Sequence, residues 1–532
     1  MRVLLAMNYF GTYFRRYESA IEELLARGHE VHLGREHGGW EDRMGGERRA
    51  RALRERYPAL SWSTSPVPGA DPKWGPYLSR SRGIGDYLDS LLSPIDRDSA
   101  LGRRARGRVD PKVVKVLDRL PAALYRRRTA LRLAVACLDR TERAIPPDPE
   151  LVDWIAGVEP DVVLLSPLLL PTSLQTEILR AAQSLGLPTA LCVASWDNLS
   201  SKQRIRVRPD LVTVWNETQR KEAVEIQRMP SEIVETTGAQ VYDEWFTWSP
   251  RSREEFCERV GLPPDRPYVL YAGGALFEAS ITEAEFAVGW VERLCSSRHA
   301  SLREAPVLFR PHPKRGEETQ RAGLEDLDGV AVWPREGRMP VEEEAKADFF
   351  DSIYHSAAVV GVNTSAMIEA GIVGRRVLAP LVPEFVDSQG KTLHFRYLSE
   401  VGGGLLELAD SMDEHLDQLA AAVAAGPDDG GASRGFLEAF VRPHGLDVPA
   451  AGVFADVVEG LAGRETAHRQ PGATTRAVDG VLRRALEPLR RRAVEIDRRR
   501  ARKQARRAEE AAEREQRERE APAAAAMGTG GD

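Results

Sequence analysis

Short apolar runs alternate with helical segments along most of the chain, and this alternation limits what the chain can fold into. The run RVLLAM at 2–7 precedes a segment of helical spacing at 15–27 that stops at Gly28, and a second apolar run, HEVHLG, follows it. Strands separated by helices of about 10 to 15 residues predict β-α-β units, whose strands lie parallel in one sheet. Further runs of this first series lie at 160–166, 188–195, 209–215 and 232–239.

A second series of the same kind begins after a polar, proline-bearing stretch at 247–256. Its apolar runs lie at 267–274, 305–313, 329–334, 358–363 and 375–381. We therefore expect an α/β fold of two Rossmann-like, doubly wound domains, one at 1–245 and one at 250–465. Ligands bind at the carboxyl ends of the strands in such sheets, so a cleft between the two domains is the expected functional site.

The overall charge and the cysteine pattern exclude several classes of protein. In 532 residues, 74 Lys and Arg against 80 Asp and Glu give a net charge of −6, which argues against a surface coated with positive charge for nucleic acid. No apolar run approaches the ~20 residues of a membrane-spanning helix. The four cysteines have no CxxC spacing, and the segment MRVLLAMNYFG lacks the features of a secretory leader. We expect a reduced, cytoplasmic protein that binds no specific nucleic acid.

Two charged segments depart from the alternation of strands and helices. Residues 97–143 hold 14 basic and 5 acidic side chains, including the run at 126–128, which is typical of a basic helical insertion. The segment 470–532 starts within a linker-like stretch, HRQPGATT, and is expected to form a charged helix or a disordered tail. A solvated helical face and, for the tail, a coiled coil are the simpler interpretations. The alternative is peripheral contact with an anionic membrane surface.

The segment GVNTSAMIEAG at 361–371 carries the strongest local signal for a ligand site. A short apolar run delivers Asn363, Thr364 and Ser365 to the first turn of a predicted helix, where unpaired N–H groups and the helix dipole attract anions. Glu369 lies four residues after Ser365 on the same face, where its carboxylate can accept hydrogen bonds from a ribose. The ordinary alternative is a helix cap followed by a solvated Glu.

The segment LFRPHPK at 308–314 places Arg310, His312 and Lys314 at every second position after a predicted strand. The prolines between them stiffen the backbone, so three cationic or protonatable groups emerge together from the carboxyl end of the strand. Such a cluster suits a diphosphate. A rigid loop with solvated charges is the alternative.

Two further polar segments follow predicted strands. In the segment 385–398, the backbone at Gly390 can approach a phosphate closely and Lys391 can neutralise it. In SWDNLSSK at 195–202, Asp197 can take a proton from an acceptor hydroxyl, although a turn built on Asp197 is nearly as favoured.

Metal and dinucleotide sites are not expected. No histidine spacing indicates zinc, and the chain has no GxGxxG motif. The two D-x-D pairs, at 96–98 and 326–328, arise easily by chance in a chain with 29% charged residues. We expect neither a bound metal nor a cofactor.

Several segments, taken together, resemble bacterial glycosyltransferases of the GT-B architecture that act in surface-polysaccharide synthesis. They are also similar to the CDP-glycerol glycerophosphotransferases of teichoic-acid synthesis. The resemblance covers about residues 150–410. The segments are ASWDNLSSK, PDLVTVWNETQRKEA, TTGAQVYDEWF, LYAGG, FRPHPK, GVNTSAMIEAGIVGRRV and QGKTLHFRYL.

The resemblance implies that the C-terminal domain binds a nucleotide-sugar donor. The cations after the strand at 305–310 would lie near the diphosphate, and the segment 363–365 would bind the donor at the start of the helix. Glu369 would lie near the ribose, and the segment 389–391 would close the donor site. The implied donor-binding residues are Arg310, Lys314, Asn363, Thr364, Ser365, Glu369, Gln389, Gly390 and Lys391, and the expected catalytic residues are Asp197 and His312.

The resemblance carries less information about the stereochemistry of the transfer reaction and about its acceptor. The paired E-x7-E signature of many retaining relatives is missing, because Val377 stands eight residues after Glu369. We therefore expect inversion, with a carbohydrate or lipid-linked acceptor. A CDP-glycerol-type glycerophosphotransferase, a UDP-sugar 2-epimerase and a non-catalytic scaffold remain as alternatives.

Overall fold

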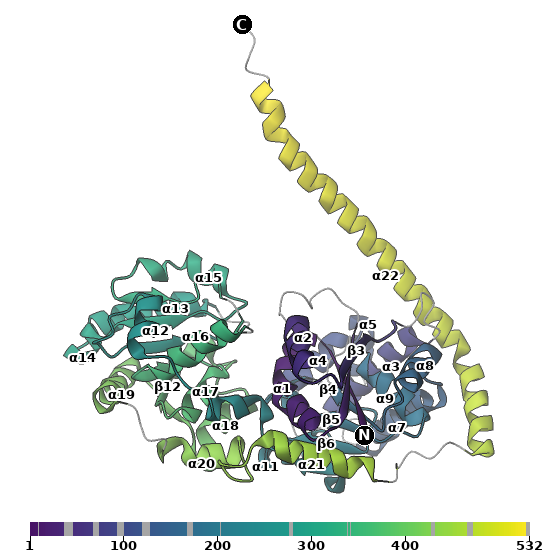
Figure 1. The fold of residues 1–532 in the computed structure, drawn as a ribbon. Coiled ribbons are helices and arrows are strands. Elements are labelled where there is room, and N and C mark those ends of the chain that lie inside the picture. Colours follow the sequence, from purple (N-terminus) through teal and green to yellow (C-terminus); the bar gives the residue numbers. More distant parts are fainter. Residues whose placement is uncertain are drawn as a thin grey trace. The chain divides into compact units, whose positions relative to one another are not determined.

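A computed structural model shows a chain built from two compact units (Figure 1). One unit comprises Met1–Val67, Ser93–Arg104 and Pro147–Arg469 and contains two β-sheets, and the other comprises Pro68–Leu92, Ala105–Pro146 and Gln470–Asp532. The structure describes residues 1–8, 10–36, 46–67, 74–92, 100–119, 128–167, 174–202, 204–275, 280–337, 339–340, 342–426, 431–464, 466 and 472–527.

The first sheet has seven strands, all parallel, in the order β3-β2-β1-β4-β5-β6-β7. The order reverses between β1 and β4, the kind of switch point at which ligands bind in open α/β sheets. The strands are β1 (Arg2–Met7), β2 (Glu30–Arg35), β3 (Leu60–Thr64), β4 (Val162–Ser166), β5 (Thr189–Cys192), β6 (Leu211–Val214) and β7 (Val234–Thr236). The helical segments that follow them are α1 (Phe10–Ala26), α2 (Gly46–Arg56), α8 (Pro149–Val158), α9 (Gln175–Ser184), α10 (Asn198–Ser201), α11 (Glu217–Lys221), the π-helical turn η2 (Glu222–Ile226) and the 3-10 turns η3 (Ser231–Ile233) and η4 (Gln240–Phe246).

Alternating side chains of β1 build a core on each face of this sheet. Val3 and Leu5 pack with residues of α1, whereas Leu4 and Ala6 pack with residues of α8 and α9. A strand places successive side chains on opposite faces, so a continuous apolar run is what a strand covered on both faces requires. The predicted doubly wound, parallel α/β class is confirmed for this half.

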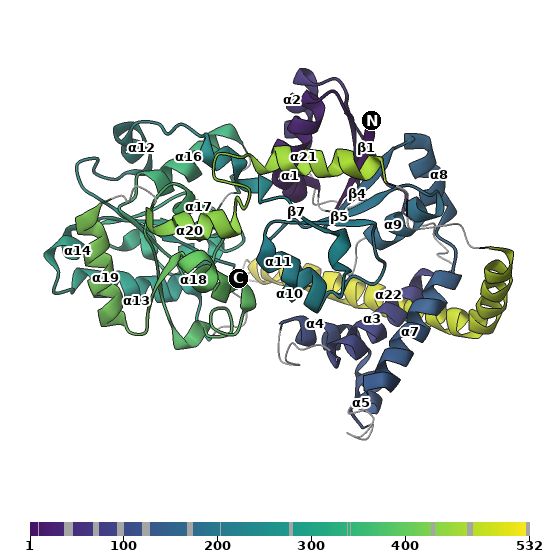
Figure 2. The same ribbon diagram turned by 90° about the horizontal axis from the view of Figure 1, so that it is seen from below.

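Helix α21 (Ala450–Ala462) packs against the core of the first sheet (Figure 2). Its apolar side chains Phe454, Val458 and Leu461 share one cluster with Phe14 of α1 and Val3 of β1. The sequence boundary at 465 assigned this helix to the second domain. That assignment is corrected, because the apolar stripe of α21 is buried on the first sheet.

The second sheet has six parallel strands in the order β10-β9-β8-β11-β12-β13. They are β8 (Val269–Ala272), β9 (Val307–Arg310), β10 (Val330–Val332), β11 (Ala358–Val360), β12 (Val377–Pro380) and β13 (Leu406–Ala409). The helices are α12 (Arg253–Val260), α13 (Glu283–Cys295), α14 (Ala300–Glu304), α15 (Gly316–Arg321), α16 (Glu343–Tyr354), α17 (Ala366–Ile372), α18 (Leu393–Glu400), α19 (Met412–Ala425) and α20 (Gly431–Phe440), with 3-10 turns η5 (Leu324–Asp326), η6 (Pro383–Phe385) and η7 (Val401–Gly403). Two buried clusters cover the two faces, so the predicted second doubly wound sheet is also confirmed.

Two glycines allow the carboxyl ends of β8 and β11 to lie close together. A Cβ at Gly274 would come within 2.7 Å of the Asn363 carbonyl oxygen, and a Cβ at Gly361 within 2.9 Å of the Ala272 carbonyl oxygen. Any larger residue would push these backbones apart, and with them the loops that follow both strands.

The second unit joins the basic insertion to the C-terminal segment. Helix α22 (Ala473–Met527) packs against α3 (Gly75–Ser90) and α7 (Arg128–Ala144), with an ion pair between Arg140 and Asp479. The unit also contains α5 (Pro111–Asp118), and α4 (Ala100–Arg108) spans the division between the units. The segment expected to be a separate tail therefore belongs with the insertion, whose residues Arg126 and Arg127 lie outside the described part of the chain. None of the described helices combines the length and the apolar composition needed to cross a membrane.

Candidate functional site

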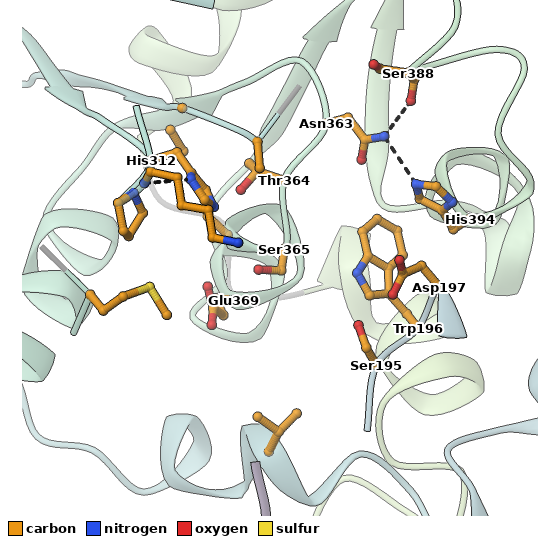
Figure 3. Close-up of a pocket in the computed structure, with 18 of the residues that line it drawn as sticks. Ser195, Trp196, Asp197, His312, Asn363, Thr364, Ser365, Glu369, Ser388 and His394 are labelled. Carbon is orange, nitrogen blue, oxygen red and sulfur yellow. Dashed lines mark hydrogen bonds between the residues drawn. The ribbon is translucent and has the colours of Figure 1, made fainter. Parts of the chain in front are cut away.

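A cavity of about 740 Å³ opens where the carboxyl ends of strands from both sheets meet. Its lining includes the loops after β5, β8, β9, β11 and β12, the first turns of α1, and residues of α4, η4, α16 and α17. Figure 3 shows Thr364, Ser365 and Glu369 on one side of this space and Ser195 to Asp197 on the other. The expected cleft between the two Rossmann-like halves is thus present, and it lies within the first unit.

Arg310 is the last residue of β9 and lines the cavity. Only 7% of the residue is exposed, and its Nη1 has no hydrogen-bond partner among the described residues. The guanidinium carbon lies 4.7 Å from the centre of the Phe349 ring. Burial lowers the pKa of Arg310 to about 10, so the side chain stays charged at neutral pH. A buried, charged group with an unsatisfied donor is a binding element for an anion.

His312 is a neutral hydrogen-bond donor rather than a cation. Its Nδ1 accepts a hydrogen bond from the backbone N–H of Lys314 at 3.1 Å, so the ring proton lies on Nε2 (Figure 3). Burial, followed by the charges of Lys314 and Arg315, lowers the pKa of His312 to about 4. The sequence grouped His312 with Arg310 and Lys314 as cationic or protonatable residues; all three line the cavity, and the lowered pKa makes His312 the neutral member of the group.

The segment from Asn363 to Ser365 reaches the cavity, but not as the start of a long helix. Helix α17 has seven residues, and Ser365 at its cap position makes no capping hydrogen bond with its side chain. The amide of Asn363 donates to the carbonyl oxygen of Ser388 and lies 3.5 Å from Nε2 of His394. Asn363 therefore ties two loops together, while the hydroxyls of Thr364 and Ser365 line the cavity.

Glu369 lies on α17 and is 3% exposed. Its carboxylate is 3.8 Å from the guanidinium of Arg15 on α1. Burial raises the pKa of Glu369 to about 7, even though Arg15, Arg16 and Arg310 oppose this shift. A carboxyl with a pKa near neutral is able to exchange a proton with a substrate.

Asp197 follows β5 and forms an ion pair with Lys202 at 2.8 Å. Burial alone would raise its pKa, but Lys202, His394 and hydrogen bonds to the carboxylate outweigh burial and hold its pKa well below the usual range. The ring of Trp196 meets the ring of His394 edge to face at 5.1 Å. A carboxylate that holds protons so weakly is a poor general base, so this environment disfavours the role expected for Asp197.

Gln389, Gly390 and Lys391, which were expected at the donor site, do not line this cavity. The Gln389 side chain is buried and bonds the backbone of three neighbours: its amide donates to Val362 and Pro380 at 3.2 and 2.9 Å, and its oxygen accepts from Val382 at 3.1 Å. Lys391 is exposed and pairs with Asp387 at 2.8 Å. From this loop, Asp387, Ser388, Thr392 and His394 reach the cavity instead.

The sequence reasoning missed most of the basic residues that gather around the cavity. The described lining holds seven Lys or Arg side chains against three carboxylates. A doubled arginine one turn into the first helix was an available signal for Arg15 and Arg16, because that helix follows the central strand β1. The basic residues are Arg15, Arg16, Arg103, Arg104, Lys202, Arg310 and Lys314, and the acidic residues are Asp197, Glu369 and Asp387.

The described residues contain no group of three or more His, Cys, Asp or Glu side chains arranged to hold a metal ion. Of the two D-x-D pairs, the one at 96–98 lies outside the described residues. The one at 326–328 begins at the end of η5 and does not line the cavity.

No protein-family model matches the chain, and no curated protein matches it by sequence. Similar solved structures include the UDP-GlcNAc 2-epimerase from Methanocaldococcus jannaschii, at a TM-score of 0.48 and 10% identity over 86% of this chain and 100% of that one. A glycosyltransferase from Rickettsia africae ESF-5 matches at a TM-score of 0.44 and 9% identity, covering 93% of this chain and 98% of that one. The Anabaena protein HepE, solved in complex with UDP and glucose, matches at a TM-score of 0.44 and 11% identity, covering 87% and 100%.

Proposed function

We propose that the chain is a glycosyltransferase that binds a nucleotide-sugar donor by its diphosphate in this cavity. The observation that carries the proposal is the buried guanidinium of Arg310, whose Nη1 has no partner among the described residues. A buried charge without a partner is costly, and a phosphate oxygen is the group that a guanidinium fork binds best. Lys314 lies exposed at the same wall and supplies a second positive charge.

Neutral donors complete the proposed diphosphate site. His312, whose Nε2–H is a donor, and the hydroxyl residues Thr364 and Ser365 line the same cavity. During transfer, negative charge grows on the leaving nucleoside diphosphate, so fixed donors and cations stabilise the transition state more than the ground state. In this proposal the chain's own cations act where other enzymes use a metal ion, and no cofactor takes part.

Glu369 is the proposed proton acceptor. The acceptor hydroxyl oxygen forms a bond to the anomeric carbon, the bond from that carbon to the diphosphate breaks, and its electron pair leaves with the nucleoside diphosphate. The hydroxyl proton passes to the Glu369 carboxylate, whose pKa of about 7 suits this step. Asp197, ionised and paired with Lys202, contributes negative charge near the acceptor instead. A single displacement of this kind inverts the configuration.

Binding of nucleotides to the purified full-length protein is the first test. We expect one member of the panel UDP, GDP, CDP and dTDP to raise the melting temperature, since a ligand at 100 times its dissociation constant adds about 2.7 kcal/mol of stability. Arg310→Met is expected to abolish this shift. Failure of every nucleotide to bind folded protein would contradict the proposal.

The products made from the matching donor then identify the reaction. A glycosyltransferase releases nucleoside diphosphate in step with a glycosylated acceptor. Interconversion of two sugar nucleotides without any acceptor would replace the proposal with a 2-epimerase. Release of CMP from CDP-glycerol would replace it with a glycerophosphotransferase.

A further inference from the structure

Five of the seven basic residues that line the cavity, all except Arg15 and Arg16, fall into two groups that come from different halves of the first unit. Arg310 and Lys314 follow β9 of the second sheet and serve the proposed diphosphate site. Arg103 and Arg104 on α4 and Lys202 after α10 line the cavity from the side of the first sheet. The second group has no role in the proposed donor site.

Contacts with the segment after β5 position Arg104 and Lys202 of the second group. Arg104 donates through Nη1 to the carbonyl oxygen of Ser201, the residue before Lys202. Lys202 in turn pairs with Asp197 at 2.8 Å, and 30% of its side chain is exposed. Arg103 and Arg104 are exposed residues, and both line the cavity.

These cations contribute to the pKa shifts of two neighbouring side chains that line the cavity. Burial lowers the pKa of His394, and Lys202 and Arg104 lower it further despite the opposing charge of Asp197. The pKa of Asp387 is also lowered, mainly by Lys391 and in smaller part by Arg103. Asp387 and His394, both in the segment that follows β12, therefore lie within reach of positive charge from this group.

We propose that Arg103, Arg104 and Lys202 form a second anion subsite, which binds a phosphate group carried by the acceptor. The proposal rests on the proposed glycosyltransferase function, because it names the acceptor of that reaction. In a single displacement the acceptor approaches the anomeric carbon from the side opposite the leaving group. The diphosphate lies against the second sheet, so the acceptor lies toward the first sheet, where this subsite is found. Paired guanidinium forks and an ammonium group suit a phosphate.

The test measures a second anion on protein whose donor site is already filled. The full-length protein is saturated with the nucleoside diphosphate that binds it, and inorganic phosphate, glucose 1-phosphate and farnesyl phosphate are titrated separately by calorimetry. The same titrations are run on Arg103→Gln/Arg104→Gln. The matched control is Arg51→Gln/Arg54→Gln, which removes two exposed arginines of α2 that do not line this cavity.

We expect saturable binding of at least one phosphate compound, weakened about tenfold or more by Arg103→Gln/Arg104→Gln and unchanged in the control. The affinity for the nucleoside diphosphate should stay the same in both variants. Tighter binding of farnesyl phosphate than of glucose 1-phosphate identifies a lipid-linked acceptor, and the reverse order identifies a sugar phosphate. Binding of inorganic phosphate alone would overturn an acceptor role. Equal losses of affinity for the phosphate compounds in Arg103→Gln/Arg104→Gln and in the control Arg51→Gln/Arg54→Gln would also overturn it.

The outcomes separate this inference from the proposed function. If no nucleoside diphosphate binds the wild type, the proposed function fails. If a nucleoside diphosphate binds but no phosphate compound binds the complex, only the second subsite is overturned.

Discussion

The guanidinium of Arg15 on α1 lies 3.8 Å from the carboxylate of Glu369 on α17, so helices that cover different sheets face each other across the cavity. Burial lowers the pKa of Arg15 and raises the pKa of Glu369 to about 7. Each pKa shift favours the neutral form of its side chain. The attraction between Arg15 and Glu369 opposes both pKa shifts without cancelling them. Glu369 therefore changes its protonation state near neutral pH within the cavity.

This relationship predicts the pH dependence of the transfer reaction. Glu369 accepts a proton only when it is ionised, so kcat should rise with pH through about 7 and level off above it. Glu369→Gln should lower kcat by about 100-fold or more and remove the rise, whereas Asp197→Asn should keep the rise. The measurement is kcat at saturating donor from pH 5.5 to 8.5. A Glu369→Gln variant that keeps the full pH dependence would show that another group accepts the proton.

Two buried arginines should respond oppositely to the same substitution. Arg442 is 5% exposed and donates through Nη2 to Asp243 at 2.6 Å, and Asp243 also accepts from the backbone N–H groups of Ala450 and Ala451 at the start of α21. Arg442→Met leaves the Asp243 charge buried and should lower the free energy of unfolding by about 3–5 kcal/mol. Arg310→Met removes a buried charge without a salt bridge among the described residues.

Arg310→Met should therefore leave the melting temperature of the ligand-free protein unchanged or raised, while it abolishes nucleotide binding. Differential scanning calorimetry of the three proteins, followed by nucleotide titration, checks both statements. A loss of stability in Arg310→Met as large as in Arg442→Met would mean that Arg310 has a structural role instead.

The fixed tautomer of His312 predicts which replacement keeps donor binding. A glutamine places an N–H near the position of Nε2, so His312→Gln should retain affinity for the nucleotide sugar, whereas His312→Ala should lose about tenfold. Since the pKa of His312 is about 4, titration of this residue should not change that affinity between pH 5.5 and 8. Calorimetric titration at three pH values measures both effects. If the affinity for the nucleotide sugar changes as the pH passes 6.5 in the wild type but not in the His312 variants, His312 titrates in that range. That result would contradict a neutral His312 donor.

A buried carboxyl outside the cavity should make stability depend on pH. Burial raises the pKa of Glu222 to about 7, and its Oε1 accepts a hydrogen bond from the Tyr397 hydroxyl at 3.0 Å. The folded state holds this proton more tightly than the unfolded state, where the pKa is 4.5. The resulting stability is present below about pH 4.5 and is lost as the pH rises to about 7.

Glu222→Gln keeps the acceptor oxygen and cannot ionise, so its stability relative to the wild type should rise between pH 5 and pH 8. The gain is on the order of 3 kcal/mol at most, because each pKa unit corresponds to about 1.4 kcal/mol. Glu225→Gln, at an exposed position of the same π-helical turn, is the matched control and should show no such trend. Urea unfolding at both pH values measures the difference, and parallel curves for the two variants would refute the buried, protonated state.

The segment expected to close the donor site shows where local sequence reasoning fails. Gln389 and Lys391 have the residue types of a phosphate site, yet Gln389 satisfies three backbone groups and Lys391 points to Asp387. Residue type and distance from a strand end cannot tell which side of a loop faces a cavity, because that depends on what packs beneath the loop.

The sequence by itself determined the two parallel α/β sheets and the three segments that bring Asp197, His312 and Glu369 to one cavity. Strand-helix alternation is a local pattern, and the carboxyl ends of parallel strands must share one edge, so these features follow from short-range information. Only the tertiary structure decided the return of α21 to the first sheet, the neutral state of His312 and the gathering of Arg103, Arg104 and Lys202. These depend on burial and on contacts between segments that are far apart in the chain, which set both the packing partner of an apolar stripe and the charge state of a side chain.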